Sequence, residues 1–237
     1  MKPEKELAEV AKRKAALAAI KHVKDGFVVG LGSGSTAAYA IEALGEKLKR
    51  EKLSLLAVPT SYQAFLLAVN CGIAVTTLDE HPVIDVTIDG ADQIDAKLNL
   101  IKGMGAALTR EKIVASASKM NIIIADESKK VRVLGEKGHP VPVEVLPFAI
   151  TTVKRRIEAV GGKAVLREGK GKLGPVITDN GNAVIDASFG PIGNATELEK
   201  KLKMIPGVVE TGLFIGLADI VYVGTASAIE KIERKRK

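Results

Sequence analysis

Two kinds of apolar pattern alternate along the first half of the chain. Helices are predicted where apolar residues recur three or four positions apart or helix-favouring residues dominate, at 4–24, 36–51, 61–72 and 107–120. Short continuous apolar runs predict buried strands at 27–32, 53–60, 73–78, 83–88 and 121–126. Strands that alternate with helices in this way favour βαβ units and a parallel sheet.

Near residue 131 the pattern changes to short strands mixed with two helices. Asp179, Asn180 and Gly181 stand between alternating apolar runs, which predicts a hairpin. The later stretch 207–225 is apolar enough to rejoin the first sheet. The fold class is therefore predicted as α/β, a Rossmann-like parallel-sheet domain with a second, smaller α+β domain. The predicted boundaries are 1–130 plus 208–237 for the first domain and 131–207 for the second.

Composition narrows the possible partners and compartments. Of 237 residues, 46% are hydrophobic, which is enough for a substantial core, and no apolar run approaches the ~20 residues of a membrane helix. Cys71 is the single cysteine, which excludes an intramolecular disulfide and a cysteine-based zinc cluster. We therefore expect a cytoplasmic protein with no membrane partner.

Charge favours a solvated surface rather than a nucleic-acid site. The formal net charge is +7, but Lys and Arg are interleaved with Glu, and aromatic residues make up only 3% of the chain. Stacking platforms for single-stranded nucleic acid are therefore scarce, and no nucleic-acid partner is expected. The many Lys and Glu beside few Asn, Gln and Met are a feature of thermophilic proteins.

A glycine- and serine-rich loop, residues 30–36, follows the first predicted strand and precedes a helix. Its glycines allow a close backbone approach, and the helix amino terminus favours an anion, so a phosphate fits there. The structural alternative is a tight turn with a Ser or Thr cap. The loop lacks the lysine of a nucleotide phosphate loop. It matches the dinucleotide pattern, but the next strand ends at 58–61 without the acid that binds ribose.

Two further segments carry groups suited to acid/base chemistry. Asp89 and Asp92 flank Gly90-Ala91 directly after an apolar strand, where active sites of open α/β sheets gather. Both aspartates could instead bind backbone groups, as Asp often does in turns. Lys102 precedes a glycine pair, and Glu111 follows in the first turn of a helix, where the dipole alone favours an acid.

The sequence gives little support to a metal site or to a Ser-His-Asp catalytic triad. The acidic stretch 79–95 does not match the spacing of an EF-hand loop, and His81 lacks an HExxH-type partner. No Gly-x-Ser-x-Gly elbow with an acid and a histidine in order is present. We expect no metal and no organic cofactor. A phosphate loop, two aspartates, a lysine and a glutamate suit proton transfer on a small phosphorylated carbonyl compound.

Several sequence blocks in order resemble the type A family of ribose-5-phosphate isomerases. They are GLGSGSTA, VPTSYQA, DGADQID, LIKGMGAALTREKI, IADESKKV, PVEVLP, TDNGNAVID and PGVVETGLF. The resemblance spans nearly the whole chain. It implies a Rossmann-like domain with a smaller α+β domain and interconversion of D-ribose 5-phosphate and D-ribulose 5-phosphate without a cofactor. It also implies a sugar-phosphate ligand and a homodimer or homotetramer.

The resemblance also assigns roles to individual residues. Glu111 matches the catalytic base. Lys102, Asp89 and Asp92 are also expected in catalysis. The residues that match the family's substrate-binding positions are Ser33, Gly34, Ser35, Thr36, Asp89, Gly90, Ala91, Asp92, Lys102, Gly103, Met104, Gly105 and Lys129. The family often has Thr at Ser33, Gly at Met104 and Glu at Gln93. Met104 would be strained if its position required a backbone that only glycine adopts.

The expected mechanism moves one proton. Asp89 or Asp92 assists opening of the furanose ring, Glu111 transfers the proton between C2 and C1, and Lys102 stabilises the enediolate. Two rival hypotheses remain, a dinucleotide-dependent oxidoreductase and a non-catalytic sugar-phosphate sensor. A sensor that regulates transcription would need a helix-turn-helix, whereas a single helix precedes the first strand.

Overall fold

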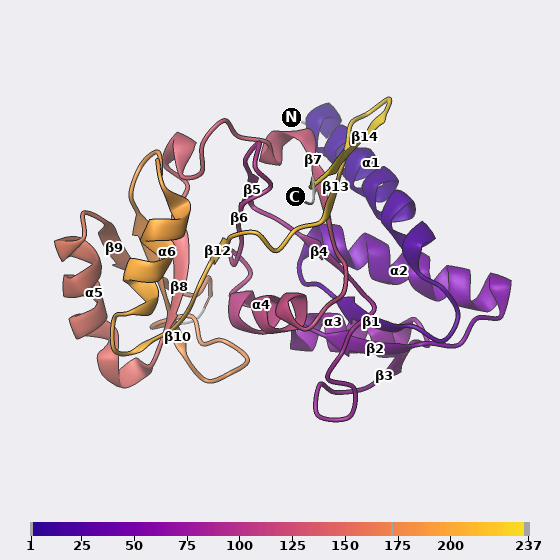
Figure 1. Cartoon of the computed structure of the whole chain (residues 1–237), viewed down its shortest axis with the longest axis horizontal. Helices are drawn as coiled ribbons and strands as arrows, with labels where there is room; N and C mark the ends of the chain where they lie inside the picture. Colours follow the sequence, from indigo (N-terminus) through magenta and orange to yellow (C-terminus); the bar gives the residue numbers. More distant parts are fainter. Residues whose placement is uncertain (1, 172, 235–237) are drawn as a thin grey trace. The chain divides into compact units, whose positions relative to one another are not determined.

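The computed structural model describes residues 2–171 and 173–234 (Figure 1). Contacts between residues divide the chain into two units. The first unit contains the chain up to Ala91, Arg110–Lys129 and the chain from Leu217 onward. The second contains Asp92–Thr109 and Lys130–Gly216. Among the described residues, no helix combines the length and the apolar character that crossing a membrane requires.

A seven-stranded sheet forms the centre of the first unit, in the order β14-β13-β7-β4-β1-β2-β3. Neighbouring strands are parallel except for the edge pair β13–β14. The strands are β1 (Val28–Leu31), β2 (Leu56–Pro59), β3 (Ala74–Val75), β4 (Val86–Gly90), β7 (Asn121–Asp126), β13 (Ile220–Gly224) and β14 (Ile229–Glu233). This mostly parallel sheet confirms the predicted α/β class.

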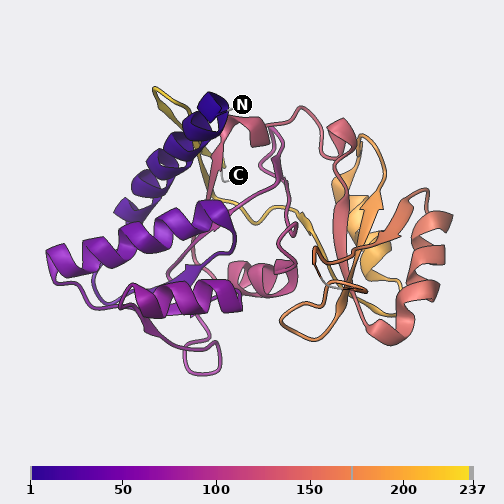
Figure 2. The same cartoon turned by 180° about the vertical axis from the view of Figure 1, so that it is seen from behind.

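Helices α1 (Lys2–Ala19), α2 (Ser35–Glu51) and α3 (Tyr62–Asn70) share one apolar core with the strands and lie in front of them in Figure 2. The core contains small alanines from the helices and β-branched residues from the strands. Helix α4 (Leu108–Ser116) contributes to a separate cluster, in which Val114 packs with Val58 and Ile84. The four helices predicted from apolar spacing in the first half of the chain therefore exist. Helices α3 and α4 are shorter than predicted at both ends, α1 begins two residues earlier and ends five residues earlier than predicted, and α2 begins one residue earlier and ends at the predicted residue.

The second unit has two antiparallel sheets. The larger has the order β11-β8-β10-β9 and shares an apolar core with α5 (Ile150–Ala159) and α6 (Ala195–Lys203). Its strands are β8 (Val141–Val145), β9 (Lys163–Leu166), β10 (Ala183–Ser188) and β11 (Val208–Thr211). The smaller sheet, β12-β6-β5, comprises β5 (Gln93–Ile94), β6 (Leu100–Ile101) and β12 (Leu213–Phe214). Single 3-10 turns are η1 (Ile20–His22), η2 (Glu127–Lys129), η3 (Glu136–Gly138) and η4 (Pro147–Ala149).

The observed division of the chain differs from the predicted boundaries at two places. Residues 92–109 and 208–216 belong to the second unit, because the two-residue strands β5 and β6 pair with β12 and because β11 pairs with β8. The apolar stretch 207–225 therefore divides between the two units, and its last strand, β13, joins the first sheet as expected.

The predicted hairpin at 179–181 forms its turn but only part of its first strand. Thr178 N–H donates to the Asn182 carbonyl over 2.8 Å, and Gly181 has a φ of 80°. Ile177 makes a single antiparallel bridge to Ala183 instead of a continuous ladder.

Candidate active site

The predicted loop at 33–36 lies at the carboxyl end of β1, between that strand and α2. Because β1 pairs in parallel with both β2 and β4, the carboxyl ends of these strands meet at one edge of the sheet. The segments that follow them therefore gather at this edge. Residues 33–36, 60–63 and 89–91 belong to this group.

Asp89 holds the loop at its backbone. Its buried Oδ1 accepts hydrogen bonds from the N–H of Ser33 over 3.2 Å and of Gly90 over 2.7 Å. A Cβ atom at residue 32 would lie 2.0 Å from this oxygen, so only glycine fits at Gly32. One oxygen of Asp89 thus binds backbone groups, as expected if the aspartate stabilises a turn.

The hydroxyl of Ser33 belongs to a small polar cluster at the end of β2. Ser33 Oγ lies 2.8 Å from Thr60 Oγ1 and donates to Ser61 Oγ over 2.6 Å. Thr60 Oγ1 donates to the Leu31 carbonyl, and Gly34 N–H donates to Gln63 Oε1 over 2.8 Å. The sequence patterns assign no role to Thr60 or Gln63 and identify Ser61 only as a helix cap, although all three residues lie in the VPTSYQA block. Their position directly after a strand is the signal in the sequence that points to them.

The amino terminus of α2 is open to an anion. Its N-cap is Gly34, whose φ of 90° is accessible to glycine and which supplies no side-chain cap. The first-turn N–H groups thus have no capping side chain, and the helix dipole is positive there. Lys12 Nζ donates to Ser35 Oγ over 3.4 Å, which brings an ammonium group to the same turn.

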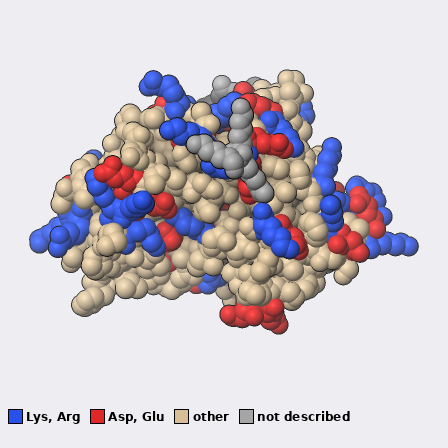
Figure 3. Space-filling view, viewed as in Figure 1, with Lys and Arg blue, Asp and Glu red and all other residues tan. Residues whose placement is uncertain are grey.

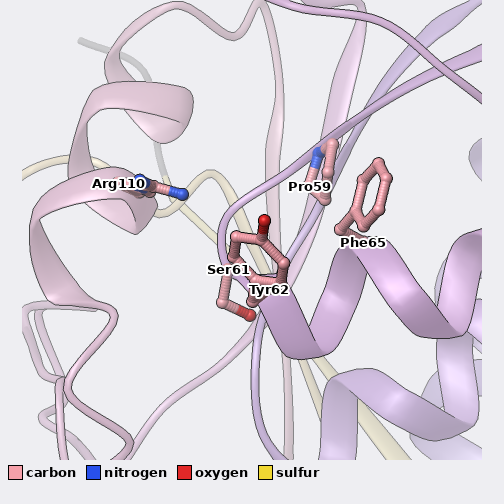
Figure 4. Close-up of a pocket in the computed structure, with 5 residues that line it drawn as sticks. All are labelled: Pro59, Ser61, Tyr62, Phe65 and Arg110. Carbon is pink, nitrogen blue, oxygen red and sulfur yellow. The ribbon is translucent and has the colours of Figure 1, made fainter. Parts of the chain in front are cut away.

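A cavity of about 190 Å³ adjoins the serine cluster. Figure 4 shows its lining residues at the end of β2 (Pro59), at the start of α3 (Ser61, Tyr62, Phe65) and on α4 (Arg110). Tyr62 and Phe65 are exposed, so the cavity has an open apolar wall. Since Ser61 also accepts from Ser33, the cavity is connected to the predicted phosphate loop.

Glu111 lies in the first turn of α4 and is 5% exposed. A carboxylate at this position interacts favourably with the helix dipole. Lys129 ends the 3-10 turn that follows β7, whose Ile123 and Ile124 pair with Asp89 and Gly90 of β4. Glu111 and Lys129 therefore belong to the first unit, as do residues 33–36 and 89–91.

The remaining predicted residues belong to the second unit. Met104 N–H donates to Asp92 Oδ2 over 3.1 Å, so Asp92 binds the segment that carries Lys102. Lys102 is 3% exposed, its Nζ lies 5.4 Å from the ring centroid of Phe214, and its N–H donates to the Gly212 carbonyl. The structure thus groups Asp92 with residues 102–104 and groups Asp89 with Ser33.

Glycine is required in this segment at residue 103 but not at residue 104. Gly103 has a φ of 106°, and a Cβ atom there would lie 2.9 Å from Cβ of Leu108. The described non-glycine residues with positive φ are Lys52, Leu98, Ala106 and Lys137, so Met104 does not need a glycine backbone. The expected strain at Met104 is absent.

Metal-ligating groups do not cluster in the part of the chain that the structure describes. No group of three or more His, Cys, Asp and Glu side chains is arranged to hold an ion there. The acidic stretch 79–95 instead divides its carboxylates among backbone and side-chain donors: Asp85 binds Val28 N–H and Lys119, and Glu80 binds Thr76.

The surface carries charges of both signs. On the face shown in Figure 3, Lys and Arg side chains lie among Asp and Glu side chains rather than in one continuous basic area. This distribution agrees with the interpretation of the +7 net charge as a solvated surface.

Fold and site together define an α/β protein whose first unit has a glycine- and serine-rich loop at the carboxyl edge of a parallel sheet and a buried acid, Glu111, and whose second unit has a buried lysine, Lys102. Residues 56–228 match the family model described as ribose 5-phosphate isomerase A (phosphoriboisomerase A). The chain belongs to this family.

Curated relatives and solved structures agree with this assignment. Ribose-5-phosphate isomerase A of Methanothermobacter thermautotrophicus is 52% identical, with 92% of this chain and 96% of that protein covered. The protein of the same name from Pyrococcus horikoshii is 50% identical, with 95% of this chain and 99% of that protein covered. A solved D-ribose-5-phosphate isomerase in complex with phospho-erythronic acid has a TM-score of 0.93 and 50% identity, covering 96% of this chain and 99% of that one. The predicted family and fold are therefore confirmed.

Proposed function

We propose that Glu111 is the base with which this chain, a ribose-5-phosphate isomerase, interconverts D-ribose 5-phosphate and D-ribulose 5-phosphate. The observation that carries the assignment is the buried carboxylate of Glu111 in the first turn of α4. A base must remove the proton on C2 of the aldose and return it to C1 of the enediolate. A carboxylate that is screened from water and held on a rigid helix suits this transfer.

Phosphate binding is assigned to the loop at residues 33–36. Supporting features are the uncapped first turn of α2, the positive φ of Gly34 and the ammonium group of Lys12 beside Ser35. A phosphate anchored at a helix amino terminus places the sugar carbons at a fixed distance from the anchor. Its binding energy then contributes to orientation of the reacting carbons. The Ser33 hydroxyl serves the loop itself, so backbone N–H groups carry most of the contact.

The resemblance to the family assigns the charge of the enediolate to Lys102. Its ammonium group is nearly buried, and electrostatic stabilisation is strongest where water is excluded. Asp89 and Asp92 share the proposed task of moving the hydroxyl proton during ring opening. Each also holds one of the two loops by a backbone hydrogen bond. Lys129 is proposed as a further substrate contact.

The ligand of the solved relative agrees with an enediolate pathway. Phospho-erythronic acid joins a phosphate to a carboxylate, and a carboxylate is planar and anionic like an enediolate. We propose that this chain binds the same compound, competitively with ribose 5-phosphate. Transition-state resemblance would make the compound bind more tightly than the substrate.

The decisive experiment replaces Glu111 by Gln. Glu111→Gln keeps the size of the side chain and removes the base, so turnover falls by about 10²–10⁴-fold. Loss of the C2 proton of ribose 5-phosphate to D2O, followed by NMR, falls equally, while the Kd for phospho-erythronic acid changes little. Glu158→Gln, at an exposed position of α5, is the matched control and keeps full activity. Near-normal turnover in Glu111→Gln would remove Glu111 from the role of base.

Assembly and location complete the proposal. Apolar side chains that follow β8 and α6 in the second unit are exposed, among them Leu146, Phe148 and Met204. Such exposure supports an assembly of two or four copies of the chain, which light scattering after gel filtration measures directly. We also propose a cytoplasmic location, which the single, unpaired cysteine supports.

A further inference from the structure

Three segments from the blocks that carry the family resemblance, LTREK, PVEV and TDNGN, have no part in substrate binding as proposed above, apart from Glu111 itself. Within the second unit they meet at one side chain, Glu144 in β8. Its residue is 0% exposed, and its carboxylate receives hydrogen bonds from neutral groups of the other two blocks.

The two oxygens of Glu144 have different partners. Oε1 accepts from Thr178 Oγ1 over 2.9 Å, from Asn180 Nδ2 over 3.0 Å and from Asn182 Nδ2 over 2.8 Å. These three donors belong to the turn between Ile177 and β10. Oε2 accepts from Thr109 Oγ1 over 2.6 Å, and Thr109 lies in the first turn of α4.

Glu144 places a carboxylate in the middle of a buried strand, which is unusual for a charged group. Removing it from water is unfavourable, and an apolar residue of similar volume would serve a core at least as well. The hydrogen bonds offset the desolvation and make the geometry specific, because the short bond to Thr109 is directional. Glu144 thus links a strand and a turn of the second unit to the start of one particular helix.

We propose that Glu144 is a positioning residue for the isomerase reaction, and that it acts through Thr109 to fix the first turn of α4 and thereby the Glu111 carboxylate. Thr109 precedes Glu111 by two positions, so the side chains point to different sides of the helix. Glu144 therefore has no need to reach the reacting atoms. A hydrogen bond at Thr109 opposes rotation and sliding of the first turn, and any such movement displaces Glu111 as well.

This inference rests on the proposed role of Glu111, and a matched pair of threonine substitutions tests it. Thr109→Val and Thr178→Val make the same chemical change at buried positions, and each removes one hydrogen bond to Glu144. Thr178 Oγ1 also accepts from the N–H of Asn180 and of Asn182, so its loss destabilises the turn as well. Thr178→Val should therefore lower the Tm at least as much as Thr109→Val.

Kinetics separate positioning from stability. We expect Thr109→Val to lower kcat by about 10-fold or more, because small misplacement of a catalytic group reduces rate strongly, while KM changes less than twofold. Exchange of the C2 proton should slow by the same factor. Thr109→Ser keeps the hydroxyl and should restore kcat, and Thr178→Val should keep kcat within twofold of the unmodified protein. If Thr109→Val does not fold, Thr109→Ala serves in its place.

Two results would overturn the inference. One is a kcat within twofold of the unmodified value in both Thr109→Val and Thr109→Ala. The other is an equal loss of kcat in Thr178→Val, which would mean that the network supports the fold alone. A fully active Glu111→Gln would instead refute the base assignment itself, so the two failures are distinguishable.

Discussion

At the scale of single residues, the site depends on close contacts between positions far apart in the sequence. Asp89 approaches Ser33 and Gly32 across two neighbouring parallel strands. The residue types at 32–36 and at 89–92 mark both segments as candidates for the substrate site. The sequence pattern does not reveal that one oxygen of Asp89 accepts a hydrogen bond from the backbone of the loop. That contact arises from the register of β1 against β4.

A prediction at this scale concerns Gly32. Alanine there would place a Cβ atom 2.0 Å from Asp89 Oδ1, so Asp89 must move and the bond to Ser33 N–H is lost. We expect Gly32→Ala to lower the free energy of unfolding by about 1–3 kcal/mol, the range typical of overpacking. The KM for ribose 5-phosphate should rise several-fold. Urea unfolding and steady-state kinetics measure the two effects.

Gly26→Ala is the control for this prediction. Gly26 has a φ of 75° with no atom near its missing Cβ, so alanine there is strained only in its backbone, by about 1–2 kcal/mol. It should lose stability and keep an unchanged KM. An unchanged KM in Gly32→Ala as well would show that the contact with Asp89 does not shape the substrate loop.

At the scale of elements, the sequence predicts helices better than short strands. The predicted helix 61–72 starts with a serine, a residue that favours the cap position, and Ser61 Oγ accepts from Ala64 N–H at the start of α3. The strands β5, β6 and β12 have two residues each, and a period of two cannot be detected over two residues. The strand β14 is rich in charge and lies at the sheet edge, so no apolar run marks it.

Helices α3 and α6 each have a side-chain cap, which allows a prediction about capping. Ser61 and Asn194 each accept a hydrogen bond from the backbone three residues later, so Ser61→Ala and Asn194→Ala should each reduce stability by about 1 kcal/mol. Only Ser61 also accepts from Ser33 and lines the cavity. We therefore expect a higher KM in Ser61→Ala and unchanged kinetics in Asn194→Ala. Equal kinetics in the two variants would separate the Ser61 cluster from substrate binding.

At the scale of the whole molecule, the chain passes between its two units several times. One passage falls between Ala91 and Asp92, and another falls between Thr109 and Arg110. Both lie inside segments that the sequence analysis marked for chemistry. Apolar patterns do not reveal such passages, because residues on both sides of them are turn-rich or helical. This is why the predicted boundaries at 131 and 207 differ from the observed division into units.

The last prediction concerns how global stability depends on pH through His22. Its Nε2 lies 2.8 Å from Tyr222 Oη. Burial lowers the pKa of His22 below its ordinary value of 6.5, Lys231 lowers it further, and Glu233 opposes the shift. The unfolded chain therefore binds the histidine proton more tightly than the folded chain. The free energy of unfolding consequently rises with pH across this window.

This stabilisation is complete above pH 6.5 and is lost as the pH falls from 6.5 through the lower folded pKa. The neighbours keep their charges in this range, because the Glu233–Lys231 contact lowers the pKa of Glu233 and raises that of Lys231. His22→Gln retains a polar group for Tyr222 but does not titrate. Urea unfolding between pH 5.5 and 8 should therefore show that the free energy of unfolding depends less steeply on pH in His22→Gln than in the unmodified chain. Equal slopes in the two proteins would mean that His22 contributes nothing to the pH dependence of stability. The difference is expected because only the unmodified chain must protonate a partly buried imidazole as the solution becomes acidic.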